Sequence, residues 1–110
     1  MAQAQAWTPG SEIVGQSMVV QTNGVSNTVY FDPGGTARIV SPAGSTVNGT
    51  WSAVNGQLCL SVGGAQECFP YAQAFRAGQA VTLTSSCNNT ATLVANSVNP
   101  PQQAVQGERG

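Results

Sequence analysis

The stretch 50-TWSAVNGQLCLSVGGAQECFPY-71 decides the fold of this 110-residue chain. It contains three runs of strand-forming residues, separated by Asn55-Gly56 and by Gly63-Gly64. Such pairs readily adopt the positive φ angles that a tight hairpin turn requires. If each pair is a two-residue turn, the chain folds back on itself twice. We therefore predict two consecutive antiparallel hairpins over residues 50–71.

The register of these hairpins predicts which side chains face the core. Pairing is counted outward from the first turn, so Val54 lies opposite Gln57 and Trp51 lies opposite Leu60. Successive side chains of a strand point to opposite faces, and one face therefore collects most of the large apolar residues. We expect this face to be the core, and it carries Trp51, Ala53, Leu58, Leu60 and Val62.

The second turn brings two cysteines together. Counting from Gly63-Gly64 places Cys59 opposite Cys68 in a non-hydrogen-bonded pair, where Cα atoms about 4.5–5.5 Å apart accept a disulfide. We predict a Cys59–Cys68 disulfide, whose loop closure contributes about 2–3 kcal/mol in the chain-entropy picture. Cys87 is then a free thiol, either open to intermolecular pairing or buried as a small apolar residue. A disulfide indicates an oxidising compartment, so we expect a secreted or periplasmic protein.

The rest of the chain repeats the pattern of short strands and turns. No window shows a sustained helical period of apolar residues. Strands are expected at 17–22, 25–32, 36–40, 46–54, 57–62, 65–71, 79–86 and 90–95. Asn23-Gly24 is a further hairpin turn, whereas Asn48-Gly49 lies inside a run and is interpreted as a bulge. The predicted fold class is all-β: an antiparallel meander of about eight short strands that forms a small up-and-down barrel or a two-sheet sandwich.

The two ends of the chain differ in composition from the middle. Residues 1–11 contain Ala-x-Ala triplets, the small-residue pattern of a signal-peptidase site, and we interpret them as a disordered remnant of processing. An Ala- and Gln-rich start of a cytosolic protein is the alternative. Residues 97–110 include paired prolines and few apolar side chains, and are expected to be a disordered tail. A single β domain then spans residues 12–96.

Charged groups are scarce, and their absence excludes several classes of function. The chain has no His and, because its three basic residues are Arg38, Arg76 and Arg109, no Lys; its net charge is −1. A His-based catalytic relay, a Schiff-base lysine and a phosphate-loop lysine are therefore excluded, and three scattered Arg against four carboxylates disfavour nucleic-acid binding. No apolar run approaches the roughly 18 residues of a membrane-spanning helix. We expect a non-enzymatic protein without cofactor or metal that binds neither nucleic acid nor membrane.

One carboxylate stands out as a candidate binding residue. The register places Glu67 on the apolar face, where a carboxylate needs a partner or access to water. Arg38 is the expected partner and Arg76 the second choice, and such a pair in the mouth of a barrel would anchor a small ligand. A bulge near Gly64 that turns Glu67 outward is the alternative interpretation.

Two tyrosines and the low charge bear on partners. Tyr30 and Tyr71 are candidate recognition residues where they are exposed, although packing at the core or rim also accounts for them. A surface this poor in charge also permits self-association through strand edges. We therefore expect a binding or inhibitor module for a small molecule or a protein, with a self-assembling structural subunit as the alternative.

Several short motifs recur in one known group of proteins. They are Gly49-Thr50-Trp51, Leu58-Cys59-Leu60, 67-ECFPY-71 and, before them, 30-YFDPGGT-36. In this combination the chain resembles small secreted β-rich proteins of proteobacteria, of unknown function, over about residues 12 to 95. The resemblance implies secretion and a β fold, and it implies no activity or ligand.

Overall fold

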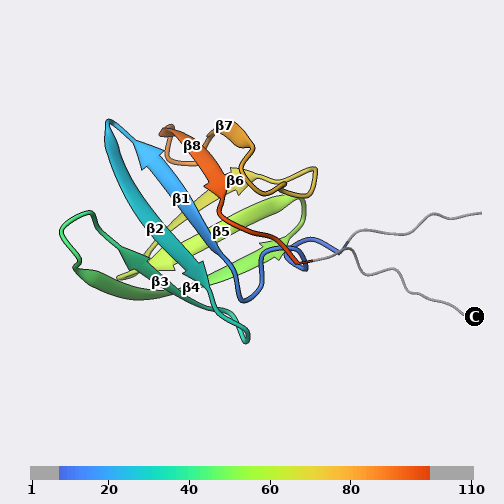
Figure 1. Ribbon diagram of the computed structural model, residues 1–110, viewed down its shortest axis with the longest axis horizontal. Helices are drawn as coiled ribbons and strands as arrows, with labels where there is room; N and C mark the ends of the chain where they lie inside the picture. The colour runs from blue at the N-terminus through green and yellow to red at the C-terminus, as the bar shows by residue number, and fades with distance from the viewer. Residues whose placement is uncertain (1–7, 100–110) are drawn as a thin grey trace, which may run out of the picture.

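The computed structural model describes residues 8–99, which form eight antiparallel strands wound into a nearly closed barrel (Figure 1). The strands are β1 (Ser17–Thr22), β2 (Val25–Phe31), β3 (Thr36–Val40), β4 (Thr46–Val54), β5 (Gln57–Val62), β6 (Ala65–Pro70), β7 (Ala80–Thr84) and β8 (Thr90–Ala95). Their order in the sheet is β6-β5-β4-β3-β2-β1-β8-β7. The predicted all-β meander is confirmed, and of the two predicted architectures the barrel is the one that forms.

The predicted hairpin register is confirmed. Val54 pairs with Gln57 and Trp51 with Leu60, around a turn in which Asn55 and Gly56 have φ angles of 54° and 73°. These are the left-handed values that an Asn-Gly turn supplies at low steric cost. Side chains therefore fall on the inner and outer faces of the sheet as the sequence predicts.

The predicted disulfide is also present. Cys59 pairs with Cys68 across β5 and β6, and their sulfur atoms are bonded. A disulfide here is compatible with an oxidising compartment. Because the bond joins neighbouring strands, it fixes the hairpin that ends at the β6 edge of the sheet.

The bulge predicted at Asn48-Gly49 is wrong. Gly49 pairs with Ala37 in regular register and has no positive φ angle. A Cβ atom at this position would lie 2.3 Å from the carbonyl oxygen of Ser61. The glycine is therefore required by the close approach of β5, not by a break in the ladder.

The core lies between the inner faces of the strands. Phe31 points inward and is 1% exposed, whereas its neighbour Tyr30 points outward, as strand alternation requires. The buried cluster contains Ile13, Met18, Val29, Phe31, Leu58, Phe69, Tyr71, Phe75, Ala91, Leu93 and Ala95.

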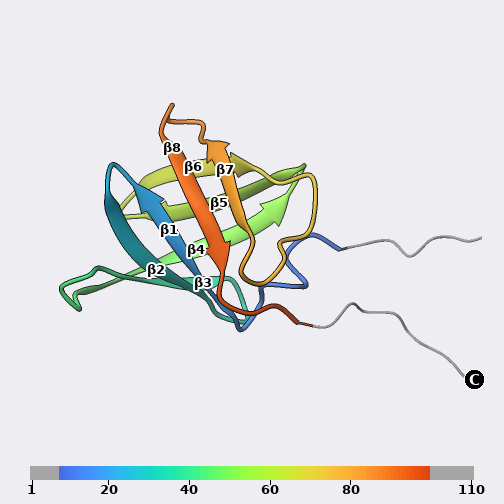
Figure 2. The same ribbon diagram turned by 45° about the horizontal axis from the view of Figure 1, so that its top comes forward.

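The two ends of the barrel are built differently (Figure 2). Turns 23–24, 41–45, 63–64 and 85–89 surround one end, which we call the mouth. Segment 8–15 lies across the other, the closed end, where Gly10 packs against the indole of Trp51.

Contacts of the barrel extend beyond the predicted domain of residues 12–96. The Gly10 N–H donates a hydrogen bond to Tyr71 Oη at 2.9 Å. Asn99 Nδ2 donates to the carbonyl oxygens of Ser11 and Val14 at 3.0 and 2.7 Å. Residues on both sides of the predicted domain, Gly10 and Asn99 among them, therefore pack on the closed end. The remaining parts of the two segments predicted to be disordered, 1–7 and 100–110, lie outside the described residues.

Candidate binding site at the barrel mouth

A pocket of about 370 Å³ opens at the mouth. Aromatic side chains, including Trp51 and Phe75, fill the closed half of the barrel. The walls of the mouth half are mostly aliphatic, and these shorter side chains leave a hollow along the barrel axis. The apolar residues that line the pocket are Val20, Val29, Ile39, Val47, Leu60, Val62, Ala65 and Phe69. Val47 faces inward by its register and is still 48% exposed.

Glu67 lies on the pocket wall. It pairs with Leu60 in regular register, so it faces inward, and the alternative of a bulge that turns it outward is wrong. Its Oε2 accepts hydrogen bonds from Ser85 Oγ at 2.5 Å and from Asn89 Nδ2 at 3.1 Å. The carboxylate therefore joins β6 to the turn between β7 and β8.

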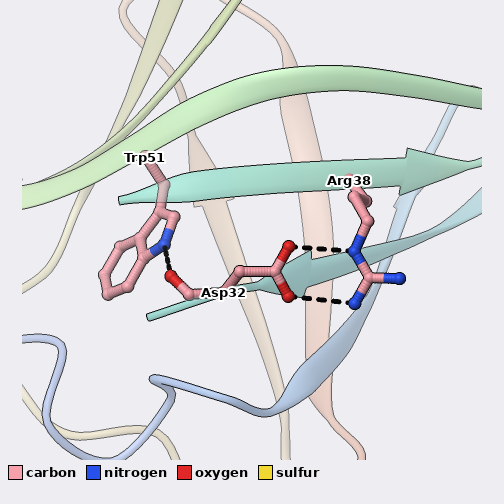
Figure 3. Close-up of polar contacts among 3 residues, drawn as sticks. All are labelled: Asp32, Arg38 and Trp51. Atoms are coloured by element: carbon pink, nitrogen blue, oxygen red, sulfur yellow. Dashed lines mark hydrogen bonds and ion pairs between the residues drawn. The ribbon is translucent and has the colours of Figure 1, made fainter. Parts of the chain in front are cut away.

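The predicted Glu67–Arg38 pair is wrong, because Arg38 lies on the outer face. Its Nε and one terminal nitrogen each donate a hydrogen bond of 2.9 Å to the carboxylate of Asp32 (Figure 3). These hydrogen bonds lower the pKa of Asp32 and raise that of Arg38. The guanidinium also lies 4.5 Å from the centroid of the Tyr30 ring, so Tyr30 packs beneath Arg38 away from the pocket.

The turn that carries Asp32 is also tied to the core. Trp51 Nε1 donates a hydrogen bond of 3.0 Å to the Asp32 carbonyl oxygen, as Figure 3 shows. The indole in turn meets Phe31 edge to face, with ring centroids 5.3 Å apart. Asp32 is thus a turn residue with a structural ion pair.

Tyr71 is buried, so its predicted role as an exposed recognition residue is wrong. It is 2% exposed at the closed end, where its hydroxyl donates to Glu12 Oε2 at 2.5 Å. The same oxygen accepts the Phe75 N–H at 2.9 Å. Burial, and then the hydrogen bond to Glu12, raise the pKa of Tyr71. Sequence reasoning missed this cluster because Glu12 sat at the edge of the predicted domain.

Arg76, the second predicted partner of Glu67, lies elsewhere. It lines a separate pocket of about 510 Å³ between residues 70–76 and β7. Within the described part of the chain, the one salt bridge joins Arg38 and Asp32, and it involves neither Arg76 nor Glu67. The structure therefore separates the three charged groups that the sequence analysis grouped together.

Cys87 is a free thiol at the rim of the mouth pocket. The alternative in which it is buried is wrong, because the residue is exposed. Its Sγ lies 3.7 Å from the carbonyl oxygen of Gln66. The thiol is thus open to solvent beside the pocket.

Within residues 8–99, no cluster of three or more His, Cys, Asp or Glu side chains could hold a metal ion. In that same range, the structure has no helix that is long and apolar enough to cross a membrane. Comparison with protein-family models, with curated proteins and with solved structures found no match.

Proposed function

We propose that this protein is a non-enzymatic binding module of an oxidising compartment, secreted or periplasmic, which holds a small and mainly apolar ligand in its mouth pocket. The observation that carries the proposal is the hollow itself. Its volume of about 370 Å³ falls in the size range of small-molecule sites, and apolar side chains with a few polar groups form its wall.

The polar side chains that line the pocket favour some ligands over others. Glu67 contributes a carboxylate, and no basic side chain is among the residues that line the pocket. Asn27 and Asn89 add amide groups that donate and accept hydrogen bonds. A neutral or cationic polar group on the ligand fits these side chains better than an anionic one.

The placement of the carboxylates supports a binding role over catalysis. Glu12 lies at the closed end and Glu67 at the mouth, while Asp32 is paired with Arg38 on the outer face. Hydrolysis of a glycosidic bond by two carboxylates requires both of them on one cleft, about 5–10 Å apart. These three groups face three different environments.

Binding of the neutral fluorescent dye Nile red tests the proposal. We expect the dye to bind the wild type, and Val47→Trp, which fills the pocket from β4, to weaken binding by about tenfold or more. Val54→Trp is the matched control, because Val54 is 56% exposed on the outer face of the same strand. Failure of the wild type to bind the dye, or equal weakening by both variants, would contradict the proposal.

A further inference from the structure

The two end strands of the sheet, β6 and β7, face one another across a seam that is only partly closed. On the mouth side the seam is bonded: the Ser86 N–H donates to the Cys68 carbonyl oxygen at 2.8 Å. The Cys68 N–H donates to Ser86 Oγ at 3.0 Å. Beyond this point toward the closed end, no strand pairing joins β6 to β7 in the described residues.

The β6 edge is blocked to a further strand. Because the Tyr71 N–H donates to the Gly56 carbonyl oxygen, the backbone groups of Gln66, Cys68 and Pro70 point away from β5. Ser86 occupies both backbone groups of Cys68, and Pro70 has no N–H to donate. A head-to-tail assembly that needs both edges of the sheet is therefore disfavoured.

The β7 edge is open. The Ser85 N–H donates to the Asn89 carbonyl oxygen, so the alternating backbone groups of Ala80, Thr82 and Thr84 point away from β8. The strand reads AVTLT, with no charge and no proline. It thus lacks the lysines, prolines and bulges that usually protect an edge from pairing.

A groove of about 510 Å³ lies beside this edge, between residues 70–76 and β7. Val81 and Leu83 contribute apolar side chains to its wall. Arg76 is the one charged residue among those that line it, and no acidic side chain pairs with Arg76 within residues 8–99. The groove and the strand edge beside it therefore combine unpaired backbone donors and acceptors, apolar surface and one positive charge.

We infer that the β7 edge is a docking site for an extended peptide segment of a partner protein that carries an acidic side chain. The segment adds as a strand to the backbone groups of Ala80 and Thr82, on the closed-end side of the Ser86–Cys68 hydrogen bonds, and its carboxylate reaches Arg76. Addition of a strand to an exposed sheet edge is a common mode of peptide recognition. The site is separate from the mouth pocket, so it stands whether or not that pocket binds a small ligand.

A second copy of this chain fits the groove less well. Its own β7 is flanked by its own residues 70–76, which would have to enter the same groove. Its β7 also carries no carboxylate for Arg76. A single extended chain with an acidic residue meets neither obstacle.

Panning a phage-displayed library of random ten-residue peptides against the protein tests this inference. We expect enrichment of sequences that alternate β-branched residues and contain Asp or Glu. Thr82→Pro removes one outward N–H and leaves the hydrogen bonds to β8 in place, so it should abolish capture of these peptides. Thr82→Val is its control, since it keeps the N–H and also lacks the hydroxyl contact with Thr92.

A second variant tests the charge without touching the strand. Arg76→Gln should weaken binding of a synthetic copy of an enriched peptide by about three- to tenfold, and less at high salt. In NMR spectra this peptide should shift the amide signals of Ala80 and Thr82. The inference is overturned if no peptide sequence is enriched, or if Thr82→Pro binds the peptides like the wild type. It is also overturned if the peptide shifts the NMR signals of the mouth residues. Light scattering that shows a dimer for the wild type and a monomer for Thr82→Pro would assign the edge to self-association and overturn it as well.

Discussion

The two ends of the barrel each hold one glutamate, and the comparison shows how burial decides what a carboxylate does. Glu12 at the closed end is 7% exposed, and its oxygen accepts hydrogen bonds from the buried hydroxyl of Tyr71 and from the Phe75 N–H. Glu67 at the mouth is partly exposed, and accepts hydrogen bonds from Ser85, which is 5% exposed, and from the exposed Asn89 of the turn between β7 and β8. Where water is excluded the carboxylate stabilises the fold, whereas the carboxylate at the mouth lines the pocket in which we propose that a ligand binds.

Replacement of Glu12 should have the largest effect of the changes at the two ends. Glu12→Ala leaves the Tyr71 hydroxyl and the Phe75 N–H without this acceptor in a buried site. We expect a loss of about 3 kcal/mol in the free energy of unfolding, measured by urea denaturation. Asp32→Ala is the control, because it removes a carboxylate from a solvent-exposed ion pair and should cost much less. Equal losses for the two variants would show that the Glu12 cluster does not stabilise the closed end.

Tyr71→Phe tests the same end by removing only the hydroxyl. We expect a loss of about 1–2 kcal/mol at neutral pH, because the Gly10 N–H and Glu12 each lose a partner. The pKa of Tyr71 is raised in the folded protein, so the unfolded chain releases this proton first as the pH rises.

The wild type should therefore lose stability above about pH 10, where an unfolded tyrosine ionises, and this loss should continue toward the higher folded pKa. Tyr71→Phe lacks this contribution, so the stability gap between the two proteins should narrow as the pH rises. Unfolding curves collected across the alkaline range measure that gap. A constant gap would mean that the Tyr71 hydroxyl is not held in its protonated form by the fold.

The sequence predicted the pairing of the hairpins better than the packing of residues 8–15 across the closed end. The Asn-Gly and Gly-Gly turns fix strand register locally, so the pairing of Cys59 with Cys68 and the inward direction of Glu67 follow from counting. Residues 8–15 contain no such local pattern. Their place across the closed end depends on contacts with Trp51 and Tyr71, which are distant in sequence.

The partners of the charged residues could not be predicted from strand alternation alone. Arg38 and Glu67 lie in different strands, and alternation within each strand does not relate the faces of strands that are not neighbours in the sheet. If the register is counted from each strand to the next through the meander, Arg38 falls opposite Tyr30 on the outer face. The hydrogen bonds from Ser85 and Asn89 depend on how the barrel closes, which no local pattern encodes.

Of the two glutamates, Glu67 should contribute less to stability, so its replacement tests whether water reaches the carboxylate at the mouth. Glu67→Gln keeps an acceptor oxygen for Ser85 and Asn89, and we expect it to lose less than about 1 kcal/mol in urea unfolding. Glu67→Ala removes that acceptor. The exposed Asn89 amide can turn to water, but Ser85 is 5% exposed and its hydroxyl loses its acceptor, so a loss of about 1–2 kcal/mol is expected. If Glu67→Ala instead costs as much as Glu12→Ala, water is excluded from the mouth as it is from the closed end. The carboxylate would then hold the seam between β6 and the 85–89 turn, and a ligand could reach it only by breaking those hydrogen bonds.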